Sequence, residues 1–427
     1  MEGYAFLLDL ALILLSTKVF GLLTKKFQMP QVVGALVAGL LLGPAMLGMI
    51  KETEFITDCA EIGVVVLMFC AGMETDVNEL KRTGKASFVI ALMGVIIPLI
   101  GGFGIAWIFN RPSLIATEEG LCSTFLQNIF VGVILTATSV SITVETLREL
   151  GKLKTASGNA ILGAAIIDDI LGIVALTIIT SLADTSVNVF IVLLKILGFF
   201  VFAGVAGFAY YKFYKYMCKR DVVGKHRHAI ISFVFCLLMS YIAETVFGVA
   251  DITGAFIAGL VISCTHRSSY LASKFDVISY LFLSPIFFAS IGLKVELPKM
   301  NAAIIGFALC LTLIAVLTKI VGCGLGAKIC KYKNSQCIKI GVGMISRGEV
   351  ALIVASKGAA VGLLGANFLG PVVIVVVITT IITPILLKIV YKEKYGATVF
   401  NENTLSISYD EVNQMREESD EAHKLAK

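Results

Sequence analysis

The sequence is poor in charge: Asp, Glu, Lys and Arg make up 15% of its 427 residues, against about 25% in a typical soluble domain. It also contains a single tryptophan and only four histidines. Hydrophobic residues reach 57%, and the mean hydropathy is +0.91. A water-soluble protein of this composition could not cover its surface with polar groups. The composition therefore excludes a cytosolic enzyme, a nucleic-acid-binding protein and a secreted disulfide scaffold, and indicates a polytopic membrane protein.

The ten cysteines lack the spacing of a metal or redox site, because no CxxC pair and no Cys/His cluster occurs. They stand singly in apolar segments, and we interpret them as small core residues. The first apolar segment also lacks a basic n-region and a small-residue cleavage site, so we expect a retained membrane span. We expect no cofactor and no enzymatic activity.

Long apolar segments are abundant. Because about 20 helical residues cross about 30 Å of hydrocarbon, these segments predict an all-α fold of about 13 transmembrane helices. The predicted spans are 4–23, 31–50, 57–73, 86–109, 125–144, 156–182, 188–217, 229–247, 250–265, 275–293, 302–326, 338–356 and 360–390.

Lysine and arginine are concentrated in alternate loops between these segments, for example at Lys81, Arg148 and Arg267. The positive-inside rule then places the N-terminus outside and the C-terminus in the cytoplasm, as an odd number of spans requires. The segment 396–427 is a polar tail with seven acids and three bases, and we assign it no function.

The chain repeats itself, because the segment 34–40 aligns with 254–260 and one register holds across the first spans of both halves. After a short deletion, Gly132 and Val133 align with Gly341 and Val342. Spans one to six thus match spans eight to thirteen, and the odd number of crossings between partners inverts the second copy. Inverted repeats are typical of secondary transporters, in which broken helices of both repeats meet at mid-membrane.

Glycines recur within the repeated motif, and they have a second interpretation. Gly34, Gly39, Gly254 and Gly259 are also what close packing of two helices requires, without any transport function. The prediction of a transporter therefore depends on the inversion and not on these glycines.

Two acids, Asp168 and Asp169, stand at the midpoint of the sixth span. Each carboxylate costs a few kcal/mol at the bilayer centre, so the pair needs partners, protons or cations. Lys319, deep in the eleventh span, is the natural counter-charge. The alternatives are an ion-pair network that only holds helices together, and a Lys319 side chain that reaches the membrane surface.

The fifth span contains a run of hydroxyl side chains that includes Thr136, Thr138 and Ser139. Such residues can satisfy backbone groups in an unwound helix, whose free carbonyls are ligands for a hard monovalent cation. Its repeat partner at 341–349 carries three glycines with Arg347 and Glu349, and we predict a second broken helix there. Hydroxyls that bond back to an unbroken helix are the alternative.

These motifs, in this order, resemble the monovalent cation:proton antiporter superfamily. The resemblance is carried by 30–35 with Gly43-Pro44, by 60–63 with 69–74, by Asp168-Asp169 and by 346–352. Within the superfamily the chain is most similar to bacterial electrogenic sodium/proton antiporters with thirteen spans, including the spore-germination type that can also involve potassium. The resemblance covers roughly residues 1–390.

The resemblance implies a homodimer in the lipid of a bacterial cell membrane, with no nucleic-acid partner. It implies a scaffold at 1–85 and 229–300, a moving core at 86–187 and 301–390, and a linker helix at 188–217. Ala35 replaces a glutamate that is frequent in glutathione-gated potassium-efflux relatives, and we expect no nucleotide-binding domain of their kind.

The resemblance also implies roles for single residues. Asp169 would be the principal carboxylate for cation and proton, and Asp168 the partner of Lys319. Thr138 and Ser139 would form the unwound crossing. Thr136, Arg347 and Glu349 would be supporting polar residues.

The function expected from these features is exchange of sodium or lithium for protons by alternating access, with a potassium/proton antiporter of the same fold as the alternative. An intramembrane aspartyl protease would also need two membrane-embedded acids, but the GxGD motif is missing and the one Tyr-Asp pair, Tyr409-Asp410, lies in the tail. A cation channel would need rings of carbonyls from several subunits or repeats.

Overall fold

The structure of the protein is a computed structural model that describes residues 4–26, 29–111, 122–183, 189–220, 225–265, 268–295 and 302–392. The tail predicted at 396–427 lies outside these residues. Within them every regular element is a helix. The helices are α1 (Ala5–Lys26), α2 (Gln31–Leu42), α3 (Glu54–Glu74), α4 (Val77–Phe109), α5 (Thr124–Ile134), α6 (Val140–Glu149), α7 (Ala156–Ala183), α8 (Val189–Arg220), α9 (Lys225–Ile242), η2 (Ala243–Phe247), α10 (Asp251–Ser263), α11 (Ser268–Ile278), η3 (Ser279–Leu283), α12 (Ser284–Leu293), α13 (Ala302–Ile329), α14 (Asn334–Gly343), α15 (Glu349–Ala360) and α16 (Ala366–Tyr391).

Short polar residues start several of these helices. The side chain of Thr53 accepts a hydrogen bond from the backbone N–H of Ile56 at the start of α3, and the side chain of Asp76 does the same for Asn78 in α4. Each satisfies one of the free N–H groups that a helix leaves at its N-terminus. Gly248, with φ of 65°, ends η2 in a left-handed conformation that favours glycine.

The predicted all-α membrane fold is confirmed. In the described part of the chain, nine helices are long and apolar enough to cross a membrane, and shorter apolar helices fill four other predicted spans. Two of the thirteen segments consist of two half-helices, α5 with α6 and α14 with α15. These are the spans for which the sequence predicted broken helices.

Some predicted ends are wrong. The fifth span was expected to stop at residue 144, yet α6 continues to Glu149 and keeps Glu145 buried. The twelfth span was expected to stop at residue 356 and the thirteenth to start at residue 360, but α15 runs to Ala360 and α16 begins at Ala366. Both errors come from treating a charged residue, Glu145 or Lys357, as a helix end, although a helix can continue when such a side chain finds partners or solvent.

The internal repeat reappears in the helix boundaries. α2 begins at Gln31 and α10 begins at Asp251, in the same register that aligns Gly34 with Gly254. α6 begins at Val140 and α15 begins at Glu349, in the register that aligns Gly132 with Gly341. The two halves of the chain therefore contain the same series of helices.

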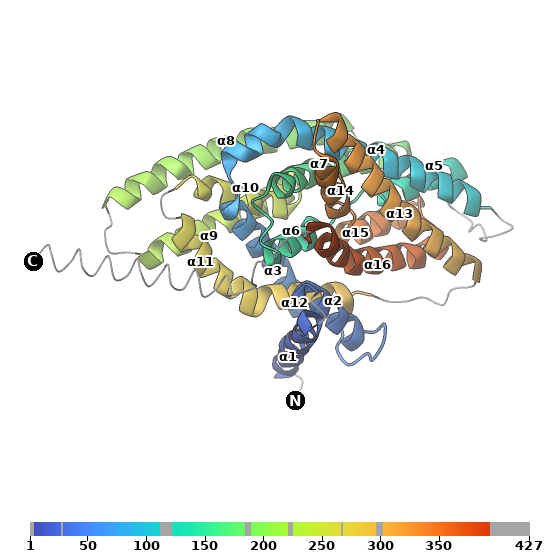
Figure 1. The fold of residues 1–427 in the computed structure, drawn as a ribbon, viewed down its shortest axis with the longest axis horizontal. Coiled ribbons are helices and arrows are strands. Elements are labelled where there is room, and N and C mark those ends of the chain that lie inside the picture. The colour runs from blue at the N-terminus through green and yellow to red at the C-terminus, as the bar shows by residue number, and fades with distance from the viewer. Residues whose placement is uncertain are drawn as a thin grey trace, which may run out of the picture.

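The helices pack as two groups (Figure 1). The crossing group consists of α4–α7 and α13–α16, in which α4 packs on α5, α7 and α13. The flanking group consists of α1–α3 and α9–α12, in which α3 packs on α10 and α2 on α12. The long helix α8 contacts α7 in one group and α10 in the other. The first and last described spans thus lie in different groups.

The motif glycines mark close helix contacts within the flanking group. A Cβ atom on Gly34 would meet the backbone of α1, and a Cβ atom on Gly254 would meet the backbone of α9. A Cβ atom on Gly39 would meet α12, and one on Gly259 would meet α3. The pairing is the same in both repeats, so these glycines serve packing, as the second interpretation held.

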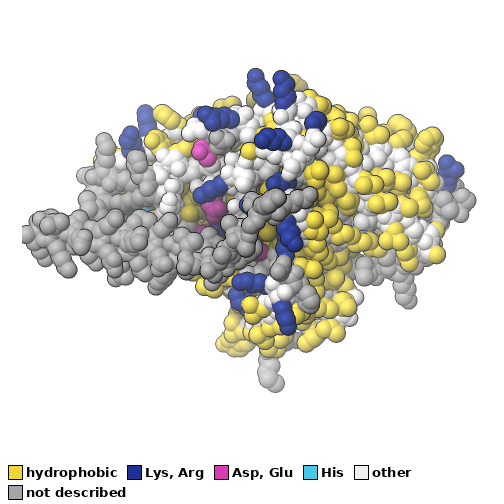
Figure 2. Space-filling view, viewed as in Figure 1, with side chains coloured by type: hydrophobic (Ala, Val, Ile, Leu, Met, Phe, Trp, Pro, Cys, Tyr) yellow, Lys and Arg dark blue, Asp and Glu magenta, His cyan; other side chains and the backbone are white. Residues whose placement is uncertain are grey.

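Large apolar side chains cover much of the surface (Figure 2), where they gather over α4, α5 and α13 on the right of the view. Such a surface suits lipid and not water. Cys70, Cys236, Cys323 and Cys337 are buried as expected, but Cys264 is exposed, so the interpretation of the cysteines as core residues is wrong there. The side chain of Cys218 lies outside the described part.

Candidate functional site

The two broken helices cross each other. α5 ends at Ile134 before α6 begins at Val140, and the backbone between them is not helical. The same kind of break separates α14 from α15. The backbone N–H of Ser139 donates to the carbonyl of Ser346 at 2.7 Å, and the hydroxyl of Ser346 donates to the carbonyl of Ser139 at 2.7 Å. The alternative of one unbroken helix is therefore wrong.

Hydroxyl side chains satisfy other groups at the crossing. The Thr136 hydroxyl donates to the Val133 carbonyl at 2.7 Å, and the Thr143 hydroxyl donates to the Gly343 carbonyl in the other repeat at 2.8 Å. Both threonines are almost fully buried. An unwound backbone at membrane depth is tolerated because such bonds replace the helical ones.

Arg347 lies in the break between α14 and α15 and is fully buried. Its guanidinium donates to the carbonyls of Ile345 at 3.0 Å, Leu135 at 2.5 Å and Ala315 at 3.3 Å. Leu135 directly follows α5, so the cation lies where the negative end of that half-helix stops. The resemblance implied only a supporting role for Arg347, and the structure shows that it binds carbonyls of both broken spans.

Asp168, in α7, lies within hydrogen-bonding distance of Lys319, in α13. The ammonium group lies 3.0 Å from each carboxylate oxygen, and the Thr138 hydroxyl donates to Oδ2 at 2.6 Å. All three side chains are almost fully buried. Lys319 is 0% exposed, so the alternative in which it reaches the membrane surface is wrong.

Asp169 follows on α7 with a half-buried side chain, so the two acids have different surroundings. Consecutive helical residues point about 100° apart. Glu349 begins α15, but its side chain lies outside the described part. The structure thus brings Asp168, Lys319 and Thr138 together, and Ser139 lies at the adjoining crossing.

A glycine makes room for the ion pair. A Cβ atom on Gly94, in α4, would lie 3.7 Å from Asp168 Oδ1, 3.7 Å from Lys319 Nζ and 2.6 Å from the sulfur of Cys323. A side chain at this position would displace at least the cysteine. Three long helices, α4, α7 and α13, therefore enclose the carboxylate and the ammonium group.

The groups at the crossing that could bind a cation are carboxylate, hydroxyl and carbonyl oxygens. In the described ranges no three His, Cys, Asp or Glu residues come together as a metal site. Oxygen donors of this kind suit a hard cation of low charge. A carboxylate can also take a proton in place of such a cation, so the same group can carry either.

A second polar cluster, which the sequence analysis missed, lies at the other end of α6. Arg148 contacts Glu74 of α3 and Asp276 of α11, and Glu149 contacts the start of α2. In the sequence, Arg148 served only as one of the positive charges that orient the membrane spans. The spacing of Glu145, Arg148 and Glu149 on one helix could have indicated a polar face.

Comparison with known proteins gives consistent matches over the membrane part of the chain. Residues 11–393 match the family described as sodium/hydrogen exchanger, transmembrane. The chain is 39% identical over 394 residues to the Na⁺/H⁺-K⁺ antiporter GerN of Bacillus cereus, covering 92% of this chain and 97% of GerN. It is 36% identical over 391 residues to a Na⁺/H⁺ antiporter of Enterococcus hirae, covering 91% of this chain and 98% of that protein.

Among solved structures, the chain is similar to the sodium proton antiporter MjNhaP1 from Methanocaldococcus jannaschii. The TM-score is 0.64 at 18% identity, and the match covers 91% of this chain and 97% of that one. At this identity the likeness concerns the fold alone. Together with the crossed half-helices and the two acids of α7, the sequence matches show that the chain belongs to the sodium/hydrogen exchanger family.

Proposed function

We propose that the chain exchanges sodium or lithium for protons across the cell membrane, with cation and proton competing for Asp169. The observation that carries this proposal is the buried group of Asp168, Lys319 and Thr138 beside Asp169 at the crossing of two broken helices. The names of GerN and of the Enterococcus hirae antiporter support sodium/proton exchange. Because the name of GerN also includes potassium, a potassium/proton antiporter is the second candidate.

Competition for one carboxylate explains obligatory exchange. If Asp169 holds either a cation or a proton, then each time the site turns from one side of the membrane to the other it carries a cation or a proton. The gradient of the cation can therefore drive the protons, and the gradient of protons can drive the cation. Asp168 begins with its charge balanced by Lys319. When a cation bound at Asp169 also attracts Asp168, the ion pair weakens and Lys319 can release a proton. More than one proton then exchanges for each cation, and transport is electrogenic.

Alternating access requires one part of the protein to move against another. In this proposal the flanking group is the scaffold and the crossing group is the moving core, with α8 as the linker. The protein acts as a homodimer, with the N-terminus outside and the C-terminus in the cytoplasm. The lysines and arginines at the inner ends of the spans support this orientation. No resident cofactor is needed, because the cation and the proton are substrates.

The test is proton flux in proteoliposomes, driven by sodium, lithium or potassium in turn, with and without a membrane potential. Asp169→Asn keeps the size of the side chain but removes the charge, so we expect exchange to fall to the level of empty liposomes. Glu52→Gln, on the half-exposed ion pair with Lys294, is the matched control and should retain full exchange. Full sodium-dependent flux in Asp169→Asn would overturn the assignment.

Lys319→Ala tests the coupling. In this variant we expect the rate of exchange to depend less on the membrane potential than in the unchanged protein. Equal voltage dependence in both proteins would show that Lys319 carries no coupled proton.

A further inference from the structure

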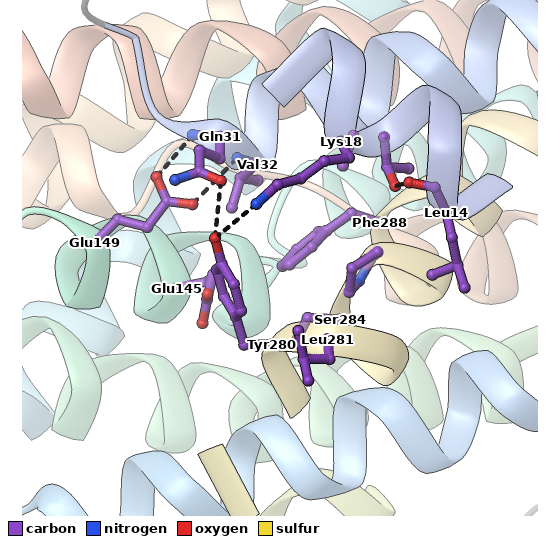
Figure 3. A pocket seen from close by; sticks show the side chains of 13 residues that line it. Leu14, Lys18, Gln31, Val32, Glu145, Glu149, Tyr280, Leu281, Ser284 and Phe288 are labelled. Carbon is purple, nitrogen blue, oxygen red and sulfur yellow. Dashed lines mark hydrogen bonds between the residues drawn. The ribbon is translucent and has the colours of Figure 1, made fainter. Parts of the chain in front are cut away.

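Two neighbouring residues at the end of α6 reach from the crossing group to the flanking group. Glu149 accepts hydrogen bonds from the backbone N–H groups of Gln31 at 2.7 Å and Val32 at 3.3 Å (Figure 3). Pro30, which precedes α2, makes no side-chain cap. The N-terminus of α2 is therefore capped by a carboxylate from a helix that is distant in the chain, in the arrangement that a helix dipole favours.

Arg148 makes the second connection. Its Nε atom lies 2.9 Å from a carboxylate oxygen of Glu74, the last residue of α3, and its other nitrogens lie near Asp276 of α11 and, at 3.9 Å, near Glu145. The side chain of Arg148 is 20% exposed, so these ion pairs are partly shielded from solvent. One short segment of the crossing group thus binds three helices of the flanking group.

A cavity of about 310 Å³ lies between the two groups beside these contacts. Figure 3 shows its polar residues, among them Glu145 and Glu149 from α6, Lys18 from α1 and Tyr280 from η3. Ala35 of α2 also lines it. The cavity marks the boundary between the groups, and the Glu149 contact with α2 lies at its edge.

Burial along α7 differs on the two sides of the acids. Residues 157–165, between the acids and the end of α7 that lies near α6 Glu149, are all buried. Residues 169–176, on the other side, are all half-buried. Ile166 and Ile167, directly before the acids, are half-buried. In the orientation proposed above, most of the cytoplasmic half of α7 is therefore covered by other parts of the protein in this conformation.

We infer that Arg148 and Glu149 form an intracellular latch, which holds the crossing group against the flanking group while the site is closed to the cytoplasm. The inference rests on the proposed function, because it assumes that the two groups move apart on this side. In each transport cycle Glu149 leaves the start of α2 and Arg148 leaves Glu74 and Asp276. Transport therefore requires this contact both to form and to break.

The first test joins the two sides of the latch. Cysteines replace Gln31 and Glu149, and a short bifunctional methanethiosulfonate reagent links them through two disulfides in proteoliposomes. We expect sodium/proton exchange to fall more than tenfold on linking and to recover when a reductant removes the link. The matched control links cysteines at Glu52 and Lys294, which both belong to the flanking group, and should leave exchange unchanged.

The second test opens the latch and reads access without transport. In everted membrane vesicles, a membrane-impermeant thiol reagent labels Ala35→Cys, and its rate is corrected for the chain without the added cysteine. Arg148→Ala with Glu149→Ala should raise this rate at least fivefold, whereas Lys294→Ala should not change it. A thermal melting profile of each variant shows that it is folded.

The outcomes separate the latch from the proposed function. Undiminished exchange after linking, or equal labelling with and without the latch residues, would overturn the latch. If instead the assignment of Asp169 as the transport site is wrong, the Asp169→Asn variant will still show sodium-driven exchange. The labelling of Ala35→Cys does not depend on that result. If the variant with cysteines in place of Gln31 and Glu149 is inactive before it is linked, the labelling rates of Ala35→Cys alone decide whether the latch exists.

Discussion

Asp168 and Lys319 are charged groups that are stable at their depth only as a pair. Each lies in a place from which water is excluded, and their distance of 3.0 Å with the added bond from Thr138 compensates for the lost hydration. A buried charge whose partner has been removed is far less favourable than the pair. The same dependence makes the pair sensitive to a cation bound nearby.

Removal of Lys319 alone should destabilise the folded protein. Lys319→Ala leaves Asp168 without its counter-charge, and the loss of one partner of a buried pair costs about 3–5 kcal/mol. The double variant Asp168→Asn with Lys319→Gln removes both charges together and should recover part of the loss. Thermal unfolding of both variants in detergent is the measurement. A double variant less stable than Lys319→Ala would contradict the argument that each buried charge depends on its partner.

The half-helices and the motif glycines show how whole elements are positioned. α5 and α14 end at mid-membrane because Arg347, Ser346 and Thr143 take over the bonds that continued helices would have made. In the flanking group, Gly39 and Gly259 allow backbones to touch, so that α2 lies on α12 and α10 on α3. Polar bonds thus hold the ends of the half-helices, and close backbone contacts set the packing of α2 and α10.

Substitution of two glycines by alanine should have opposite effects. Gly259→Ala forces a methyl group into the backbone of α3 near Phe69, and such overpacking costs about 1–3 kcal/mol. A Cβ atom on Gly306, in α13, meets nothing within 4 Å. Gly306→Ala should therefore gain up to about 1 kcal/mol from its higher helix propensity. Thermal unfolding of the two variants compares them directly, and equal melting temperatures would contradict the packing argument.

At the scale of the whole molecule, the inverted repeat of spans one to six and eight to thirteen fixes which helix ends share one side of the membrane. α6 ends at Glu149 and α10 ends at Ser263, and with thirteen crossings both ends face the cytoplasm in the proposed orientation. The latch between the two groups is on this side. A probe of the side on which Cys264 lies therefore tests both the orientation and the position of the latch.

Cys264 offers such a probe because it directly follows α10 and is exposed. A membrane-impermeant maleimide should label it in everted vesicles and not in intact cells. Cys264→Ser, as the control, should lower the labelling of everted vesicles and leave that of intact cells unchanged. Labelling of Cys264 from the outside of intact cells would reverse the orientation.

Much of the fold was predictable from local patterns. Apolar runs indicated the spans, and the alignment of 34–40 with 254–260 indicated a repeat whose helices begin at matching positions. The two acids of α7 and the hydroxyl run at 135–143 identified the region of the site, because charge and unwound backbone at membrane depth need a specific reason. The charged residues Glu145 and Lys357 did not mark helix ends, because the local sequence does not show whether such a side chain finds a partner or solvent while the helix continues.

The composition and hydropathy of the sequence required a membrane fold, and its repeat required two inverted halves, because both can be read along the chain without knowing which helices touch. Contacts between distant residues could not be predicted in this way. Arg347 binds Leu135 and Ala315, and Glu149 caps the start of α2, although no local feature of the sequence pairs them. These partners follow from helix packing in three dimensions, and they determine how the crossing is held and where the two groups are joined.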